Sequence, residues 1–398
     1  MELFLLILAA FTAAICVFLC ADVVLGIARI PMLSPGDDAN QEPSQASAES
    51  KAIAETGRPR VSIVVAARNE ERDLAEALSS LLAQDYPNYE VILVDDRSTD
   101  ATGEIADRLA TADSRLRVVH VKELPSGWLG KNHALQRGAD AASGELILFT
   151  DADVIMHPTM LRRSVAYMVE RGIDHLAIAP RVVMPNLLLE SFVITFTFVF
   201  LAYFRPWKAS DPKSRSFIGI GAFNMVRAEV YRAVGGHEPL ALRPDDDVKL
   251  GKLVKKSGYR QQFAVAPELM SVRWYASLRE LIGGLMKNAF SGVEYNVLLT
   301  VGSSLVALAM NVWPYAAVFV TSGVTRWLNV TTVVALSVAY LAAARNCRLR
   351  PWGVALFPVS MLLFIYIQWR AMLLTYIQGG VRWRGTLYPL AELKANKL

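Results

Sequence analysis

The sequence contains little cysteine, and this shortage excludes a disulfide scaffold. Only three cysteines occur in the 398 residues, namely Cys16, Cys20 and Cys347. All three lie in or beside apolar stretches, and their spacing fits neither a metal site nor a disulfide framework. We therefore expect them to be small apolar side chains buried in a membrane, which suits a reducing compartment.

The sequence also lacks a strong excess of charge. Its formal net charge is +4, and no run of Lys or Arg is interleaved with aromatic residues, so nucleic acid is not an expected partner. Hydrophobic residues make up 53% of the chain and charged residues 20%. The two kinds of residue lie in different parts of the chain, which predicts one large catalytic domain together with membrane segments.

The first 30 residues predict an uncleaved membrane anchor. Residues 3–30 are predominantly apolar, interrupted by Asp22 and Arg29, and are long enough to span a bilayer as a helix. A signal peptide is the alternative, but no basic residue precedes the stretch and no clear cleavage site follows it. Glu2 precedes the stretch and Arg29 ends it, which favours a cytoplasmic location for the residues that follow.

A linker and a sheet-forming region come next. Residues 31–58, rich in Ser, Ala, Glu, Asp, Gln and Pro, predict a flexible linker without a functional site. Residues 59–290 predict an α/β domain, because helical patterns at 70–82 and 101–110 alternate with short apolar runs. These runs predict strands at 61–65, 91–94, 118–121 and 146–149. A parallel sheet of this kind carries its site beyond the carboxyl ends of its strands.

Residues 291–398 predict a second membrane region. Apolar helices are expected at 297–320, 327–344 and 351–368. Three arginines, Arg345, Arg348 and Arg350, occupy the loop between the last two, which favours a cytoplasmic loop. If the third segment spans the membrane, the basic tail lies outside, so a re-entrant or in-plane segment is the alternative.

An apolar stretch at 187–204 interrupts the α/β region. It is short for a membrane span because Glu190 and Arg205 bound it. A core helix is one interpretation. Its many aromatic residues favour a helix lying at the membrane interface, where a lipid substrate would enter.

Acidic residues follow two of the predicted strands. Asp95 and Asp96 come directly after strand 91–94, and Asp151 and Asp153 follow strand 146–149. An aspartate at a strand end can simply cap a turn. Two acidic clusters at successive parallel strands instead favour a site for a divalent cation and for the ribose of a nucleotide.

Two further motifs carry candidate chemistry. Gly130-Lys131 precedes a helical pattern and suits phosphate binding, although such a pair is also an ordinary helix start. The acidic run 245–247 precedes a predicted helix at 248–256, where the helix dipole alone favours acidic residues. Adjacent carboxylates repel one another, however, and one with a raised pKa would suit a general base. His237, beside a Gly-Gly turn, is expected to be a surface histidine.

The region from 60 to 290 resembles the family-2 glycosyltransferases, which have the GT-A fold. The matching motifs are the segment 61–70, Val94-Asp95-Asp96-Arg97-Ser98-Thr99-Asp100, Gly130-Lys131, Asp151-Ala152-Asp153, and Asp246-Asp247 followed by Leu250 and Gly258-Tyr259-Arg260. Each motif alone is unspecific, whereas the ordered set is specific for the family.

This resemblance implies an α/β, Rossmann-like nucleotide-sugar domain between N-terminal and C-terminal transmembrane helices. The implied nucleotide-sugar ligands are Ala67, Arg68, Asn69, Glu70, Asp95, Asp96, Lys131 and Asp151. It places a divalent metal, Mg²⁺ or Mn²⁺, at Asp153 with Asp151 nearby. Asp247 is then the catalytic base, with Asp246 beside it.

The acceptor side departs from the family pattern. Processive synthases and ceramide glucosyltransferases carry Q/R-x-x-R-W, whereas this chain has Gly284-Leu285-Met286-Lys287-Asn288 in that register. Lys287 is expected to keep a cationic role toward the diphosphate. The tail 381–388 resembles the closing W-R-G-x-x-Y of lipid glycosyltransferases, and a simple interfacial anchor is the alternative. The residues expected on the acceptor and diphosphate side are Gly221, Asn224, Lys287, Arg382, Trp383 and Arg384.

Together these patterns predict an inverting glycosyltransferase that moves a sugar from a nucleotide sugar, UDP-linked by family habit, to a lipid acceptor. The alternatives are a polysaccharide synthase, a polyprenyl-phosphate glycosyltransferase or a catalytically silent scaffold. The expected location is a bacterial inner membrane, with the catalytic domain in the cytoplasm.

Overall fold

The computed structural model describes residues 1–35 and 58–396, so most of the predicted linker lies outside the described residues. The chain divides into two compact units. The apolar-helix unit comprises Met1–Ile30, Val183–Trp207 and Trp274–Ala395. The sheet unit comprises the described residues of Pro31–Val182, Lys208–Arg273 and Asn396–Leu398. The segments 183–207 and 274–290, which the sequence suggested belong to the catalytic domain, thus group with the apolar helices.

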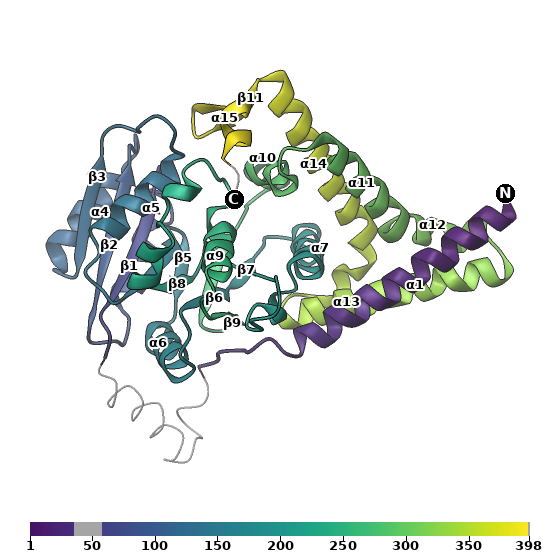
Figure 1. Cartoon of the computed structure of the whole chain (residues 1–398), viewed down its shortest axis with the longest axis horizontal. Coiled ribbons are helices and arrows are strands. Elements are labelled where there is room, and N and C mark those ends of the chain that lie inside the picture. The colour runs from purple at the N-terminus through teal and green to yellow at the C-terminus, as the bar shows by residue number, and fades with distance from the viewer. Residues whose placement is uncertain (36–57, 397–398) are drawn as a thin grey trace, which may run out of the picture. The chain divides into compact units, whose positions relative to one another are not determined.

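The sheet unit is built on a seven-stranded sheet of order β3-β2-β1-β4-β8-β6-β9 (Figure 1). Its strands are β1 (Val61–Ala67), β2 (Tyr89–Asp96), β3 (Leu116–Val121), β4 (Leu146–Asp151), β6 (His175–Ala179), β8 (Asn224–Arg227) and β9 (Gln261–Val265). Strands β3, β2, β1 and β4 are parallel, which confirms the four predicted strands. Strand β8 runs antiparallel to β4 and β6. A smaller sheet joins β5 (Val154–Met156), β10 (Met270–Arg273) and β7 (Arg181–Val183).

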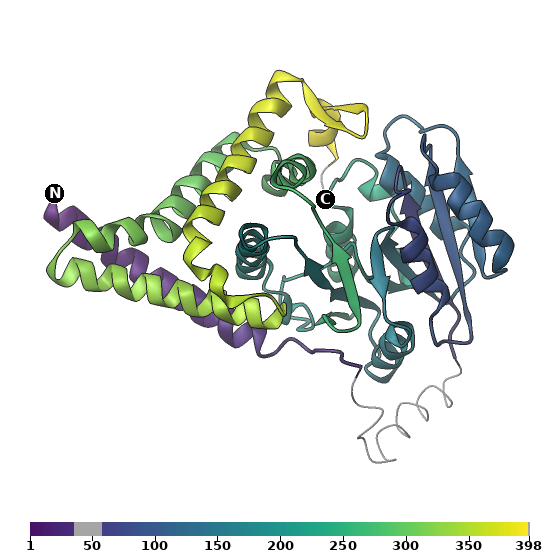
Figure 2. The same cartoon turned by 180° about the vertical axis from the view of Figure 1, so that it is seen from behind.

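Helices cover both faces of the large sheet. They are α3 (Leu74–Leu82), α4 (Thr102–Ala112), α5 (Gly130–Asp140), α6 (Met160–Glu170), α8 (Ala228–Ala233) and α9 (Asp246–Lys256). The cores group α3, α4 and α6 on one face and α5, α8 and α9 on the other. Figure 2, seen from behind, shows α3 in front of the sheet. The helices predicted at 70–82, 101–110 and 248–256 are confirmed.

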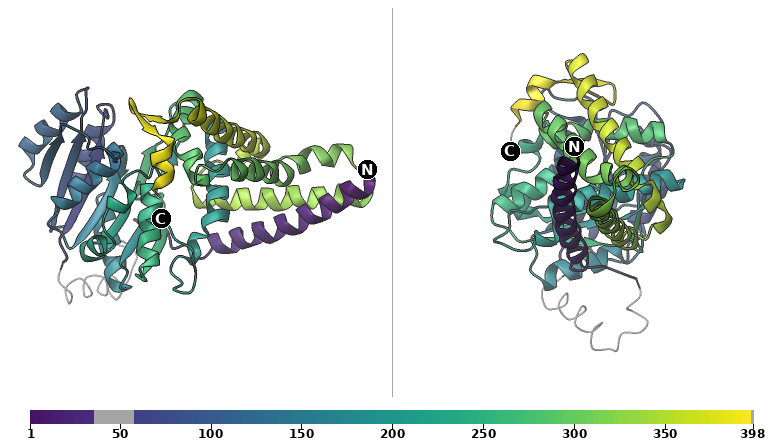
Figure 3. Two further views of the ribbon diagram at one scale, coloured as in Figure 1. Left: turned by 45° about the horizontal axis from the view of Figure 1, so that its top comes forward. Right: turned by 90° about the vertical axis from the view of Figure 1, so that its right-hand side faces the viewer.

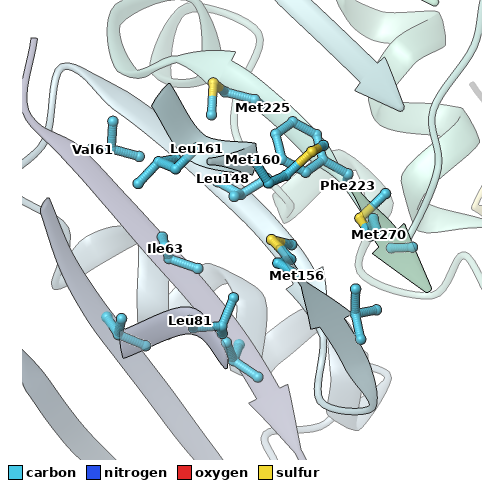
Figure 4. Packing of buried hydrophobic residues seen from close by; sticks show 14 of the residues in the cluster. Val61, Ile63, Leu81, Leu148, Met156, Met160, Leu161, Phe223, Met225 and Met270 are labelled. Carbon is cyan, nitrogen blue, oxygen red and sulfur yellow. The ribbon is translucent and has the colours of Figure 1, made fainter. Parts of the chain in front are cut away.

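The central strand β1 is apolar except for Ser62, and its place in the sheet explains this composition. Successive side chains of a strand point to opposite faces. Val61 and Ile63 join the core beneath α3 and α6, whereas Val64 joins the core beneath α5 and α9. Figure 4 shows Val61 and Ile63 packed near Leu148 and Met156. A strand buried on both faces carries no polar alternation, as expected for a parallel sheet.

The apolar-helix unit consists mainly of helices. They are α1 (Glu2–Ile27), α7 (Leu187–Phe204), α10 (Leu278–Ala289), α11 (Val297–Asn311), α12 (Trp313–Val320), α13 (Gly323–Asn346), α14 (Phe357–Ile377) and α15 (Leu390–Ala395). Helix α1 packs along α13 and touches α7, and α14 contacts α7, α10 and α11 (Figure 3). A hairpin of β11 (Gly380–Trp383) and β12 (Thr386–Pro389) follows α14. Four short 3₁₀ turns complete the described part: η1 (Pro206–Lys208), η2 (Glu238–Leu240), η3 (Ser291–Val293) and η4 (Pro351–Leu356).

Four helical stretches among the described residues are long and apolar enough to cross a membrane. They are Glu2–Ile27, Leu187–Lys208, Gly323–Asn346 and Pro351–Ile377. A fifth results if the bent pair Leu278–Val293 and Val297–Asn311, which meet at 106°, forms one span. These are candidate spans by length and composition.

Two expectations for the apolar segments need correction. The single helix predicted at 297–320 is broken between α11 and α12. Pro314 lies in the first turn of α12, where its missing N–H is tolerated, and it cannot continue the preceding helix. The stretch at 187–204 was judged short for a span. Together with η1, α7 forms a helical stretch that is long and apolar enough to cross a membrane, and α7 packs among α1, α13 and α14.

Two ion pairs join different elements within the apolar-helix unit. Arg205 Nε lies 3.0 Å from Asp22 Oδ2, joining the end of α7 to α1. Arg350 Nε lies 2.7 Å from Glu190 Oε2, joining η4 to the start of α7. Pairing of this kind is expected where ionisable groups lie in apolar segments. The two charges that bound α7 in the sequence therefore help to hold it among the other helices.

We expect Gly26→Ala to destabilise the apolar-helix unit, because a Cβ at Gly26 would overlap the indole ring of the buried Trp207. Overpacking of this kind costs about 1–3 kcal/mol. The matched control is Gly302→Ala in α11, where an added Cβ meets nothing within 4 Å. Thermal unfolding in detergent should show a lower midpoint for the first variant and an equal or higher one for the second. Equal midpoints would contradict the packing of α1 on Trp207.

Candidate functional site

Three parallel strands bring the predicted acidic residues to one edge of the sheet. In the strand register, Ala67 at the end of β1 lies beside Asp95 of β2. On the other side of β1, Ala66 lies beside Asp151 of β4. The carboxylates that the sequence placed at two strand ends therefore flank the end of the same central strand.

The turns that follow β1 and β2 are fastened together by hydrogen bonds. Asn69 has a positive φ of 55°, which asparagine tolerates better than most residues. Its N–H donates to Ser98 Oγ (3.1 Å), and its Oδ1 accepts from the Thr99 N–H (2.8 Å). The Glu70 N–H donates to Thr102 Oγ1 at 2.8 Å. The predicted residues Asn69 and Glu70 thus lie in a turn that is hydrogen-bonded to the turn after β2, and Ala67 directly precedes it at the end of β1.

Asp95 and Asp96 are both buried, and each has basic partners. Asp95 Oδ2 lies 3.0 Å from His120 Nδ1, and this hydrogen bond raises the pKa of His120. Asp96 forms an ion pair with Arg97 at 2.7 Å and a longer one with Arg68 at 3.7 Å. The Asp96 carboxylate also lies against the backbone of Gly130, where any Cβ would overlap it.

Lys131, in the first turn of α5, reaches into the acidic centre. Its Nζ donates to Asp151 Oδ1 at 2.7 Å. Burial alone would lower the pKa of Lys131, but the carboxylates of Asp151, Asp246 and Asp247 outweigh burial and raise it. The lysine therefore remains charged and serves as the shared cation of three carboxylates.

Asp153 lies among like charges. Burial, together with the carboxylates of Asp151 and Glu70, raises the pKa of Asp153 to about 7. A bound cation would offset the repulsion between these carboxylates and favour the ionised form of Asp153. Among residues 1–35 and 58–396, no group of three His, Cys, Asp or Glu side chains could hold a metal by itself. Mg²⁺ commonly takes one or two carboxylates and completes its shell with water and substrate phosphates, and the donor set here fits that arrangement.

The acidic run before α9 contains three different environments. Asp245 is held by the buried Arg243, with Nε at 3.0 Å. Asp246 lies 3.9 Å from His237 Nε2. Asp247 accepts the Val248 N–H at 2.8 Å, and burial with the adjacent Asp246 raises its pKa to about 7. Asp247 is therefore the member of the run with the properties of a general base near neutral pH.

His237 was expected at the surface, and this expectation is wrong. Its side chain is 1% exposed, and Nδ1 lies 2.7 Å from the Tyr231 hydroxyl. Burial lowers its pKa to about 3, so the ring is neutral. The aromatic ring of Phe149 packs against it edge-on, which accounts for the burial.

Gly221 marks the point where the two acidic clusters meet. A Cβ built at Gly221 would lie 2.8 Å from Asp151 Oδ2 and 3.3 Å from Asp247 Oδ2. The candidate metal residue and the candidate base, nearly a hundred positions apart in the sequence, therefore face the same small space. The glycine leaves that space open.

We expect Gly221→Ala to reduce activity strongly without unfolding the protein. The new methyl group would lie closer to Asp151 Oδ2 than ordinary contact distance and would displace that carboxylate or the one of Asp247. A misplacement of about 1 Å near reacting groups can cost roughly 100-fold in rate. Turnover should fall while the melting temperature changes little. Wild-type turnover would show that the space is not used.

The remaining predicted residues fall into two places. Asn224 is buried at 2% exposure, with its amide engaged inside the sheet unit. In the apolar-helix unit, Lys287 Nζ lies 4.2 Å from the centre of the Trp383 ring, so the two contact each other as a cation–π pair. Arg382 and Arg384 are exposed on the β11–β12 hairpin.

The sequence did not point to several residues that complete the site. His120, Arg243 and Gln261 were not singled out, yet each holds an element that carries an acidic residue or supports its backbone. His120 lies inside a strand pattern and Gln261 at the start of another, where neither residue type has a local signal. The partners of His120 and Gln261 can be recognised only once strands that are distant in the sequence have been paired.

These features define an α/β domain with an acidic centre at the carboxyl edge of its parallel strands. Residues 62–235 match the family described as Glycosyl transferase family 2. Residues 62–235 therefore belong to a family-2 glycosyltransferase domain, which confirms the predicted family for this part of the chain, and the predicted parallel α/β fold is confirmed as well.

Named relatives match part of the chain. It is 36% identical over 114 residues to the glycosyltransferase GlyG of Streptococcus pneumoniae, which is 29% of this chain and 36% of that protein. It is 40% identical over 105 residues to a beta-monoglucosyldiacylglycerol synthase of Nostoc sp., which is 26% of this chain and 22% of that protein. The chain thus spans well under half the length of these relatives.

Among solved structures, the chain is similar to a mannosyltransferase from Pyrobaculum calidifontis in complex with GDP-Man and Mn²⁺. The identity is 18% and the TM-score 0.49, with 92% of this chain and 99% of that chain covered. It is also similar to the glucosyl-3-phosphoglycerate synthase of Mycobacterium tuberculosis in complex with Mn²⁺ and UDP-glucose. There the identity is 22% and the TM-score 0.40, covering 68% and 86% of the two chains.

Proposed function

We propose that this protein transfers a sugar from a nucleotide sugar, with a UDP-sugar the first candidate, to a hydroxyl group of a lipid. The observation that carries the proposal is the meeting of Asp151 and Asp247 beside Gly221, with Lys131 as their shared cation. An enzyme that displaces a diphosphate needs a cation for the leaving group and a base for the acceptor, and this site offers both.

The donor would lie along the edge formed by β1, β2 and α5. Asp95 and Asp96 offer carboxylate oxygens to the ribose and base, and the hydrogen-bonded turns after β1 and β2 hold them in place. Lys131 offers its ammonium group to the diphosphate. It lies in the first turn of α5, where backbone N–H groups can bind the same anion. When the sugar has been transferred, the ammonium group of Lys131 would already lie beside the released diphosphate.

A divalent metal would be held by Asp153 and Asp151. Bound there, Mg²⁺ or Mn²⁺ would supply Lewis-acid stabilisation of the diphosphate's negative charge. Asp247 would accept the proton of the acceptor hydroxyl as its oxygen attacks the anomeric carbon and the bond to the diphosphate breaks. A single displacement of this kind inverts the anomeric centre.

Two observations support a lipid acceptor. Several helices are apolar enough to span a membrane. Two relatives, from Nostoc and Synechocystis, are named beta-monoglucosyldiacylglycerol synthases, which indicates a glycolipid product for those proteins. A catalytic domain joined to apolar helices would meet its acceptor at the bilayer surface.

The distribution of basic residues supports a cytoplasmic sheet unit. Helices α1 and α13 lie side by side and run in the same direction in Figures 1 and 3. Arg29 after α1 and Arg345 at the end of α13 therefore lie at the same end of the helices. Short loops rich in Lys and Arg favour the cytoplasm, and the chain enters the sheet unit directly after Arg29.

The first test is nucleotide binding by the full-length protein in detergent, measured calorimetrically with UDP and GDP, each with Mn²⁺, with Mg²⁺ or with a chelator. We expect one nucleotide to bind tightly and only with metal. Asp153→Asn should lose this metal-dependent binding, whereas the exposed Asp107→Asn should bind as wild type does. Absence of binding by either nucleotide would overturn the proposal.

The acceptor is tested with radiolabelled nucleotide sugar and extracted membrane lipids. Label entering the organic phase as a neutral or base-stable glycolipid supports the proposed hydroxyl acceptor. Label in a mild-acid-labile lipid phosphate, or in a polymer, would instead favour the polyprenyl-phosphate or polysaccharide alternatives. A protein that binds nucleotide but labels nothing would be a silent scaffold.

A further inference from the structure

A line of buried polar side chains crosses the sheet beneath the acidic loop. Gln261 of β9, His175 of β6 and Asn224 of β8 are each at most 2% exposed. They lie on three neighbouring strands, and His175 is directly opposite Gln261 in the register. Polar groups buried in a core are costly unless they are hydrogen-bonded, so their partners are informative.

The three side chains form a continuous hydrogen-bonded chain. Gln261 Nε2 lies 2.7 Å from His175 Nδ1, and His175 Nε2 lies 2.5 Å from Asn224 Oδ1. Burial lowers the pKa of His175 to about 4, so the imidazole is neutral, with one nitrogen donating and the other accepting. Because the Asn224 oxygen can only accept, His175 carries its proton on Nε2. This protonation state fixes the orientation of the His175 ring and of the amide groups of Gln261 and Asn224.

Both ends of this hydrogen-bonded chain of side chains contact the backbone of α9. Asn224 Nδ2 donates to the carbonyl oxygen of Asp247 at 3.3 Å. Gln261 Nε2 lies 3.1 Å from the carbonyl oxygen of Gly251, one turn further along α9. It also lies 3.0 Å from the Ile218 carbonyl, while its Oε1 accepts from the Ile218 N–H at 2.9 Å.

Close backbone packing completes the attachment. A Cβ at Gly219 would overlap the Asp247 carbonyl group, and a Cβ at Gly251 would overlap that of Ile218. The segment 218–219 therefore lies directly against the first turns of α9. The turn that carries Asp247 is fastened to the sheet by two glycine contacts and by the polar chain.

We propose that the chain formed by Gln261, His175 and Asn224 is a positioning device that holds the backbone of Asp247 so that its carboxylate faces Gly221 and Asp151. The three side chains do not touch substrate. This inference rests on the proposed function, in which Asp247 acts on the acceptor, and it gives Asn224 a positioning role beneath the site.

The test compares Asn224→Leu with the double variant His175→Phe/Asn224→Leu. The single variant leaves His175 Nε2–H unpaired and should lower the melting temperature. The double variant replaces both partners with apolar groups, which is often nearly neutral for stability. We expect turnover to fall about 10- to 100-fold in both variants. The nucleotide dissociation constant should stay within about threefold, since the donor groups lie on other elements.

Ser62→Ala is the matched control, because Ser62 is equally buried in the same sheet but bonds to Glu90 and Gly144, away from α9. It should lose stability and keep its turnover. A double variant that recovers turnover together with stability would overturn the proposal, since the chain would then be merely structural.

Hydrogen exchange separates this inference from the proposed function. Amides at 246–251 should exchange about tenfold faster in both Asn224 variants, while those of β1 and β2 stay protected. This readout does not need activity, so it stands even if the wild type transfers no sugar. Unchanged exchange in α9 would overturn the positioning role, whereas an inactive wild type that binds no nucleotide would overturn only the proposed function.

Discussion

Asp247→Asn is expected to lower turnover by about 10²- to 10⁴-fold, the usual contribution of a general base. The substitution keeps the size of the side chain and its acceptor oxygen for the Val248 N–H, so the loop should stay in place. Nucleotide affinity should remain near that of wild type. The melting temperature should stay equal or rise, because the variant no longer buries a carboxylate beside Asp246.

The same residue predicts a pH dependence. The base acts as a carboxylate, and its pKa is raised to about 7. Wild-type turnover should therefore rise with pH and reach half its plateau near pH 7, and Asp247→Asn should lose this limb of the profile. Asp245→Asn is the contrasting control: it removes the negative charge that is paired with the buried Arg243, so stability should fall, but the acid limb should remain. Wild-type turnover in Asp247→Asn would remove this residue as the base.

Lys131→Met is expected to weaken nucleotide-diphosphate binding roughly 10- to 100-fold, which corresponds to about 1.5–3 kcal/mol for a charge-assisted hydrogen bond. A second effect should accompany it. The lysine lowers the pKa of Asp247, so its removal should move the acid limb of the turnover profile to higher pH. Activity lost at pH 7 should then be partly recovered at pH 8 to 9.

Lys131→Arg separates charge from geometry. The guanidinium keeps the positive charge, so the acid limb should remain close to its wild-type position. Its planar fork is wider than an ammonium group, so binding of the diphosphate should still be weaker than in wild type. If Lys131→Met binds nucleotide normally and has an unshifted profile, Lys131 is only the structural partner of Asp151.

The half of the sheet formed by β1 to β4 could be predicted from the sequence because its pattern is local. Each strand is a short apolar run, and each of the first three is followed by a helix with its own periodicity. Strands β6, β8 and β9 were not predicted, since they are separated by insertions of uneven length. The break at Val312 was missed because an apolar run alone does not show whether a helix is continuous, although Pro314 marked the position.

The candidate site was predicted to a similar degree. The acidic residues at strand ends could be found because parallel strands all end at one edge. That Asp151 and Asp247 face the same glycine could not be read from spacing, since the two belong to segments far apart. The burial of His237 and Asn224 depends on Phe149 and His175, which reach them only through the folded sheet.

The ion pair between Asp22 and Arg205 has a consequence for biosynthesis. Asp22 lies near the end of α1, whereas Arg205 is added only after most of the sheet unit has been made. At bacterial translation speeds the interval is roughly ten seconds or longer. During that time this pair cannot form, because Asp22 has been made and Arg205 has not. The order of synthesis therefore means that α1 and α7 can be joined by this pair only after most of the sheet unit has been made, and that α13, against which α1 also packs, is added later still.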